Sequence, residues 1–165
     1  MSRRVSAALL AAALTLPMAA RAGKTAKPAP TPPEATALLA RDYRLVPTLA
    51  DLPESVRNAL AAYLAKAPVA DPGQPWDAKG NAKPARPTHR LLLQGYGDGA
   101  AFVAYEHGGR RKHGHLVLMS VRENALAVTY ACHIDAPAKL DLPKLRALAK
   151  TGCEPVVVGE RGEMD

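Results

Sequence analysis

The sequence lacks the short motifs that most directly indicate an enzyme. After residue 22 it contains only two serines, Ser55 and Ser120, and neither lies in the Gly-x-Ser-x-Gly turn of a hydrolase. The glycine-rich stretch 95–99 has no Gly-Lys-Ser/Thr and is therefore not a phosphate-binding loop; its Asp98-Gly99 pair predicts a hairpin turn instead. No paired carboxylates stand in a pattern typical of acid–base catalysis. These absences favour binding over catalysis.

Cysteine is also scarce, because the chain has only Cys132 and Cys153. They do not form a Cys-x-x-Cys pair, which argues against a thiol redox site and for a structural disulfide between them. No cysteine follows the N-terminal apolar run, so the lipid anchor of a bacterial lipoprotein is not expected. We predict one disulfide that contributes about 3 kcal/mol to the free energy of unfolding.

The N-terminal apolar run, Val5 to Leu16, falls well short of the ~20 residues needed to cross a bilayer. It follows Arg3-Arg4 and precedes the small-x-small sequence Ala20-Arg21-Ala22. This order is typical of a secretory signal peptide over residues 1–22, with cleavage after Ala22. We therefore expect a periplasmic or secreted protein whose mature form has no transmembrane segment and lies in a compartment that oxidises thiols.

Proline divides the mature chain into a tether, a domain and one long loop. Residues 23–33 are proline-rich and contain no large apolar side chain, which predicts a disordered tether. Residues 34–165 are enough for a single domain with its own core. Within it, residues 67–88 combine several prolines with the sole tryptophan, Trp76, and show neither helical nor strand periodicity. We interpret this stretch as a long loop.

The pattern of apolar residues predicts an α+β fold. Two helices are expected, at about 51–66 and 141–151, and both open with Asp-Leu-Pro, in which the aspartate can cap the helix. Stretches rich in Leu, Val, Phe and Tyr predict strands at 89–96, 100–107, 116–121 and 126–134. Short connections make successive strands antiparallel. We predict an antiparallel meander sheet of four or five strands with the two helices packed on one face.

Alternation along the last long strand sets the expected direction of Cys132. One core face is predicted to hold Leu126, Val128, Tyr130, Cys132 and Ile134. That face is directed toward the second helix, and Cys153 lies just beyond the end of this helix at Gly152. A disulfide would therefore join helix to sheet.

Three of the five histidines, His107, His113 and His115, lie within one connection between strands. His113 and His115 are two residues apart, so an extended chain places them on one face with Cα atoms ~6.5 Å apart. A two-residue Gly108-Gly109 turn would direct His107 to the other face, whereas a longer loop centred on Arg111 would pair His107 with His115.

The next hairpin helps to choose between these registers. A two-residue Glu123-Asn124 turn would make Val117 and Met119 core residues of their strand, and His115 shares their face. Joining them to the best core residues of the preceding strand requires the longer loop. We therefore favour the register in which all three imidazoles share a face.

The charge pattern suggests a surface for a partner. The chain has a formal net charge of +7, and Arg110, Arg111 and Lys112 form a compact positive tip on one hairpin. For an exported protein we expect another protein or an anionic envelope component as partner, not nucleic acid, with Trp76 as a further contact. The alternatives are a charged turn that blocks edge pairing, and a tryptophan packed in the core. The oligomeric state is not indicated.

The sequence is compatible with three functions. The favoured one is an exported, non-enzymatic binding, interaction or inhibitor-type accessory domain without a cofactor. The first alternative is a periplasmic metal-binding protein, because His107, His113 and His115 with an open fourth position form a site that zinc and copper both accept. The second is a small cell-envelope hydrolase in which Glu106 and the histidines act as acid and base.

Overall fold

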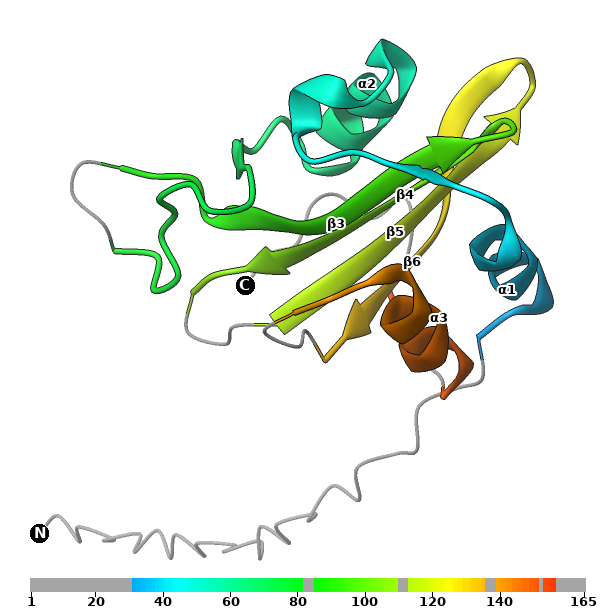
Figure 1. The fold of residues 1–165 in the computed structure, drawn as a ribbon. Helices are drawn as coiled ribbons and strands as arrows, with labels where there is room; N and C mark the ends of the chain where they lie inside the picture. The colour runs from blue at the N-terminus through cyan, green and yellow to red at the C-terminus, as the bar shows by residue number, and fades with distance from the viewer. Residues whose placement is uncertain (1–30, 82–84, 110–112, 136–138, 152, 157–165) are drawn as a thin grey trace, which may run out of the picture.

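The computed structural model describes residues 31–81, 85–109, 113–135, 139–151 and 153–156, which form an α+β fold (Figure 1). Its centre is a seven-stranded sheet in which all pairs but one are antiparallel. The strands, in sheet order, are β1 (Arg44–Leu45), β3 (His89–Gly97), β4 (Ala100–His107), β5 (His113–Arg122), β6 (Ala125–Ile134) and β7 (Glu154–Pro155). The remaining strand, β2 (Val69–Ala70), pairs in parallel with β3.

Most of the N-terminal segments predicted from the sequence lie outside these ranges. The predicted signal peptide, 1–22, and the tether up to residue 30 lie outside the described residues. The segment predicted as the loop 67–88 contains β2, and the short strands β1, β2 and β7 enlarge the sheet beyond the four or five strands expected. Among the residues that the structure describes, no helix is both long and apolar enough to cross a bilayer.

Two-residue turns join β3 to β4 and β5 to β6. Asp98 and Gly99 have φ angles of 42° and 68°, and Glu123 and Asn124 have φ angles of 49° and 67°. Consecutive left-handed residues match the twist of a tight hairpin, which is why Gly and Asn suit these positions. Both turns agree with the hairpins expected from the sequence, and they set the register of the residues next to them in the β3–β4 and β5–β6 pairs.

Helices cover both faces of the sheet (Figure 1). On one face α1 (Pro33–Ala40) and α3 (Leu142–Lys150) pack against Phe102, Leu116 and Leu118. On the other, α2 (Glu54–Tyr63) packs against Val103, Tyr105 and Val117. The prediction that the two expected helices share a face is therefore wrong. The reason lies in β4 and β5, whose central residues are apolar and buried on both sides and so require cover on both sides.

A bulge in β6 changes which of its residues face each layer. The pairing steps from Met119↔Val128 to Leu118↔Tyr130, so Thr129 is an extra residue in its strand. Val128 consequently packs with the α2 side, whereas Tyr130 and Cys132 pack with α1 and α3. The prediction of one continuous core face from Leu126 to Ile134 is wrong, although Cys132 does lie on the α3 side as expected.

The two Asp-Leu-Pro sequences, each predicted to begin a helix, form different structures. In α3 the Asp141 carboxylate accepts a hydrogen bond from the Lys144 backbone N–H at 2.8 Å, the expected N-cap. The Asp51 carboxylate instead accepts a hydrogen bond from the Thr48 hydroxyl at 2.6 Å, within a short 3-10 turn at Leu49–Asp51. Therefore α2 begins only at Glu54, without a side-chain cap.

Candidate functional site: a row of histidines

All five histidines of the sequence lie on the α2 face of the sheet, at one end of its long strands. His89 pairs with His107, and His107 pairs with His113. One step along, His115 pairs with His133. Directly paired residues point to the same side of a sheet, as do residues two apart in one strand. The result is a histidine row that crosses four strands: His89 on β3, His107 on β4, His113 and His115 on β5, and His133 on β6.

The register that creates this row differs in detail from the one expected. His107, His113 and His115 share a face, as the longer loop requires, but His107 pairs with His113 and not with His115. His115 instead pairs with Tyr105. The pairing of β4 with β5 is therefore centred one residue earlier than Arg111. Relative to the expected register, β5 is displaced by two residues along β4, and a displacement of two leaves the same side chains on the common face.

The imidazole rings are close enough to act together. The ring centroids of His113 and His115 are 4.5 Å apart, and those of His107 and His113 are 5.5 Å apart. The metal-binding atoms of His107, His113 and His115 all lie within 4.8 Å of one another. His133 extends the cluster, since its centroid lies 4.7 Å from His115 and 5.0 Å from His113.

Two aromatic stacks orient the rings of this cluster. The His107 ring lies on that of His89, with a centroid distance of 4.6 Å and an interplanar angle of 14°. The His115 ring lies in the same way on Tyr105, at 4.8 Å and 9°. A stacked neighbour restricts rotation of the imidazole about its χ2 torsion, so the planes of His107 and His115 are set before any ligand binds.

The histidine row runs from the interior of the protein to its surface. His115 is fully buried, with 0% of its residue surface exposed, while the His133 side chain is 40% exposed. His107 and His113 are half-buried. The row therefore joins a partly solvent-exposed end at His133 to a dehydrated end at His115.

His89 and His133 were not expected to belong to the site. His89 stands at the start of its strand, about 18 positions before His107, so only the β3–β4 register places the two rings together. His133 was expected on the opposite face from Val128. The bulge at Thr129 reverses that relation, and no residue pattern within β6 indicates the bulge.

Glu106 is not brought to the histidines. It lies opposite Arg90 and forms a buried ion pair with it. Because neighbouring residues of a strand point to opposite faces, Glu106 and His107 are on different sides of the sheet. The Arg90 guanidinium in turn lies 4.6 Å from the centroid of the half-buried Trp76 ring. The predicted positive tip, Arg110, Arg111 and Lys112, lies outside the described residues.

The two cysteines lie next to the histidine row in sequence but on the other face. Cys132 and Cys153 have their sulfur atoms at disulfide-bonding distance and their Cα atoms 5.6 Å apart. Both are buried in the cluster that contains Leu145 and Ala149 of α3. The bond fastens β7 to β6 immediately beside His133.

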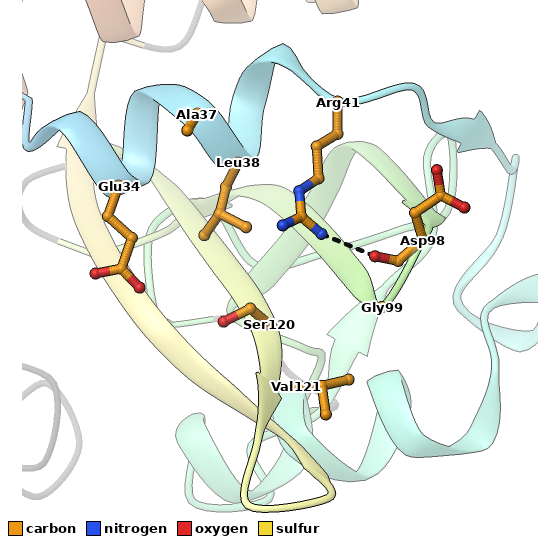
Figure 2. A pocket seen from close by; sticks show the side chains of 8 residues that line it. All are labelled: Glu34, Ala37, Leu38, Arg41, Asp98, Gly99, Ser120 and Val121. Atoms are coloured by element: carbon orange, nitrogen blue, oxygen red, sulfur yellow. Dashed lines mark hydrogen bonds between the residues drawn. The ribbon is translucent and has the colours of Figure 1, made fainter.

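A hollow of about 360 Å³ lies at the opposite end of β4 and β5, beside α1 (Figure 2). Its lining consists of Glu34, Ala37, Leu38, Arg41, Asp98, Gly99, Ser120 and Val121. The Arg41 guanidinium donates a hydrogen bond across it to the Asp98 carbonyl oxygen at 2.8 Å. Glu34 is paired with Arg122 at 3.0 Å. Its charged groups thus bind neighbouring residues, and we assign no ligand to it.

No protein-family model, curated protein or solved structure matches this chain. The geometry of its own residues is therefore the basis for a functional proposal.

Proposed function

We propose that this is an exported metal-binding protein that binds Zn²⁺ or Cu²⁺ through His107, His113 and His115. The observation that supports it is the mutual distance of their metal-binding atoms, all within 4.8 Å. Around a tetrahedral zinc ion with Zn–N bonds of ~2.0–2.1 Å, ligand nitrogens lie ~3.3 Å apart. Binding therefore requires the three rings to move closer together, through rotation of the half-buried His113 side chain toward the stacked rings of His107 and His115.

The chemistry of the donors narrows the choice of metal. Each of the three residues offers one imidazole nitrogen and no oxygen. Imidazole suits zinc and copper, whereas calcium and magnesium require oxygen ligands. The neighbouring stacks on His89 and Tyr105 support this proposal further, because oriented rings lose less conformational entropy when they bind an ion.

The proposal adopts the metal-binding alternative in place of the favoured binding domain without a cofactor, and it shares with that interpretation only a role without catalysis. The predicted signal peptide over 1–22 and the Cys132–Cys153 pair support export, since disulfides persist mainly in oxidising compartments. The separation of Glu106 from the histidines removes the acid–base pair that the hydrolase alternative needs. Arg110, Arg111, Lys112 and Trp76 remain predicted contacts for a protein partner or an anionic envelope component.

Titration of the exported form with Zn²⁺ and Cu²⁺ in a calorimeter tests the proposal. We expect one ion per chain with micromolar or tighter affinity, and a loss of more than about 100-fold in His113→Ala, since even the partners of ligands affect affinity by 10–100-fold. Ser120→Ala, at the opposite end of the same strand, is the matched control and should bind like the wild type. Absence of binding at micromolar metal would refute the proposal.

A further inference from the structure

We infer that His133 is the fourth ligand of this metal, with Glu154 as its carboxylate partner, so that four imidazoles saturate the ion. This inference rests on the proposed function. It assigns the site to a chemical class: zinc sites with four protein ligands hold the metal, whereas catalytic ones keep a position open for water or substrate. The protein would then sequester or store a metal ion and would not activate water on it.

Strand pairing is the first observation behind this assignment. His133 is the direct partner of His115 across β5 and β6, so the two rings project from the same face side by side. The His133 centroid lies 4.7 Å from that of His115 and 5.0 Å from that of His113, slightly farther than the 4.5 Å between those two. The ring planes within this trio meet at 56°, 72° and 79°. These tilted and edge-to-face arrangements leave ring edges, which carry the nitrogens, directed toward neighbouring rings.

The second observation is the orientation of the His133 ring. Its Nδ1 lies 3.8 Å from Glu154 Oε2, across the β6–β7 pair. This distance is longer than a hydrogen bond, and a rotation of the exposed Glu154 side chain would let Nδ1–H donate to it and leave Nε2 for the metal. Metal-binding histidines commonly donate their second N–H to a carboxylate, which fixes the tautomer and raises the basicity of the ligand. The carboxylate also offsets the charge that four neutral imidazoles leave on a divalent ion.

The third observation is the disulfide, which fixes this histidine and carboxylate together. Cys132 precedes His133, and Cys153 precedes Glu154. In the strand pair, His133 lies opposite Glu154, and the Cys132–Cys153 bond closes the same pair from the other face. A two-residue edge strand such as β7 has few hydrogen bonds of its own, so this bond is what keeps Glu154 beside His133.

Cobalt substitution of the full exported chain tests the inference, because a water in the fourth position of a tetrahedral Co²⁺ site can be displaced by azide, which shifts the visible bands, whereas four imidazoles leave no such position. The wild type should bind one Co²⁺ with tetrahedral bands. Azide should leave these bands unchanged. His133→Ala should still bind one ion, at more than about 100-fold lower affinity and with bands that azide shifts, whereas Glu154→Gln should keep azide-insensitive bands and lose about tenfold in affinity. Glu123→Gln, an exposed carboxylate at the far turn of β5 and β6, is the matched control.

Each result has a distinct meaning. If the wild type binds no Co²⁺, Zn²⁺ or Cu²⁺, the proposed function itself fails. If the wild type binds but its bands shift with azide, and His133→Ala retains the same affinity and the same azide response, the three-histidine site stands and the fourth ligand is overturned. Near-ultraviolet circular dichroism of each variant verifies the fold, and His133→Gln, which keeps a polar side chain at this half-exposed position, must give the same result as His133→Ala.

Discussion

The two faces of the sheet are built from the same strands, yet they differ in chemistry. The face under α1 and α3 is apolar around Phe102 and is closed by the Cys132–Cys153 pair. The face under α2 is apolar as far as Tyr105 and then continues as the histidine row. Because side chains alternate along a strand, neighbouring residues such as Cys132 and His133 serve opposite faces. The disulfide and the candidate binding site are thus separated by orientation and not by position in the chain.

The largest loss of stability is expected from a substitution that damages the α1/α3 face alone. Phe102 is fully buried and contacts Tyr43 edge-to-face at a centroid distance of 4.9 Å. Phe102→Ala should lower the free energy of unfolding by about 3–5 kcal/mol, because it removes a large buried side chain and leaves a cavity. Urea unfolding measures the loss. Val121→Ala, at a position 53% exposed, should change stability by less than about 0.5 kcal/mol.

Removing the disulfide should affect both faces. Cys132→Ala/Cys153→Ala should cost about 3 kcal/mol in free energy of unfolding, since the unfolded chain is no longer restrained. Zinc affinity should also fall, by about tenfold, because Glu154 is no longer held beside His133. Denaturation and zinc titration of the same preparation separate the two effects. A double variant with wild-type zinc affinity would show that the disulfide serves one face only.

Removing a ligand should affect the α2 face alone. At a zinc concentration 100 times the dissociation constant, binding should stabilise the wild type by about 2.7 kcal/mol. His113→Ala should lose this increment and retain nearly the stability of the metal-free wild type, because His113 is only half-buried. Thermal unfolding with and without zinc is the measurement. A large destabilisation of the metal-free variant would mean that His113 belongs to the core.

The smallest expected effect is the contribution of Tyr43 to the pH dependence of stability. Burial raises the pKa of Tyr43 above its usual 10.0, although Arg41 and Arg146 act in the opposite direction. The folded state therefore keeps the phenolic proton at a pH where the unfolded state has lost it. The contribution of this pKa difference to the free energy of unfolding is complete below pH 10, and it decreases as the pH rises toward the pKa of Tyr43 in the folded state.

Tyr43→Phe tests this dependence. At pH 7 the variant should be about 1 kcal/mol less stable, because the hydroxyl donates a hydrogen bond to the Leu38 carbonyl oxygen at 2.6 Å. Above pH 10 that difference should shrink. Urea unfolding between pH 8 and 11 measures it, with Tyr96→Phe on the other face as the control for loss of a phenol hydroxyl. A difference that stays constant across this range would contradict the raised pKa.

Much of the local structure could be predicted because its causes are local. The Asp98-Gly99 and Glu123-Asn124 turns follow from residues that tolerate positive φ, and the Asp141 cap follows from one carboxylate at a helix start. Asp51 shows the limit of this reasoning. There the Asp-Leu-Pro sequence begins at the last residue of the 3-10 turn Leu49–Asp51, and the Asp51 carboxylate accepts hydrogen bonds from Thr48 and does not cap α2.

For the candidate site, the sequence by itself determined that His113 and His115 share a face, since a period of two is a property of any strand. Only the tertiary structure decided that His107 pairs with His113, that His89 stacks on His107, and that the bulge at Thr129 directs His133 to the same side. It also decided that helices cover both faces. Alternation is a property of neighbouring residues, whereas register, bulges and layer order depend on contacts between segments far apart in the chain.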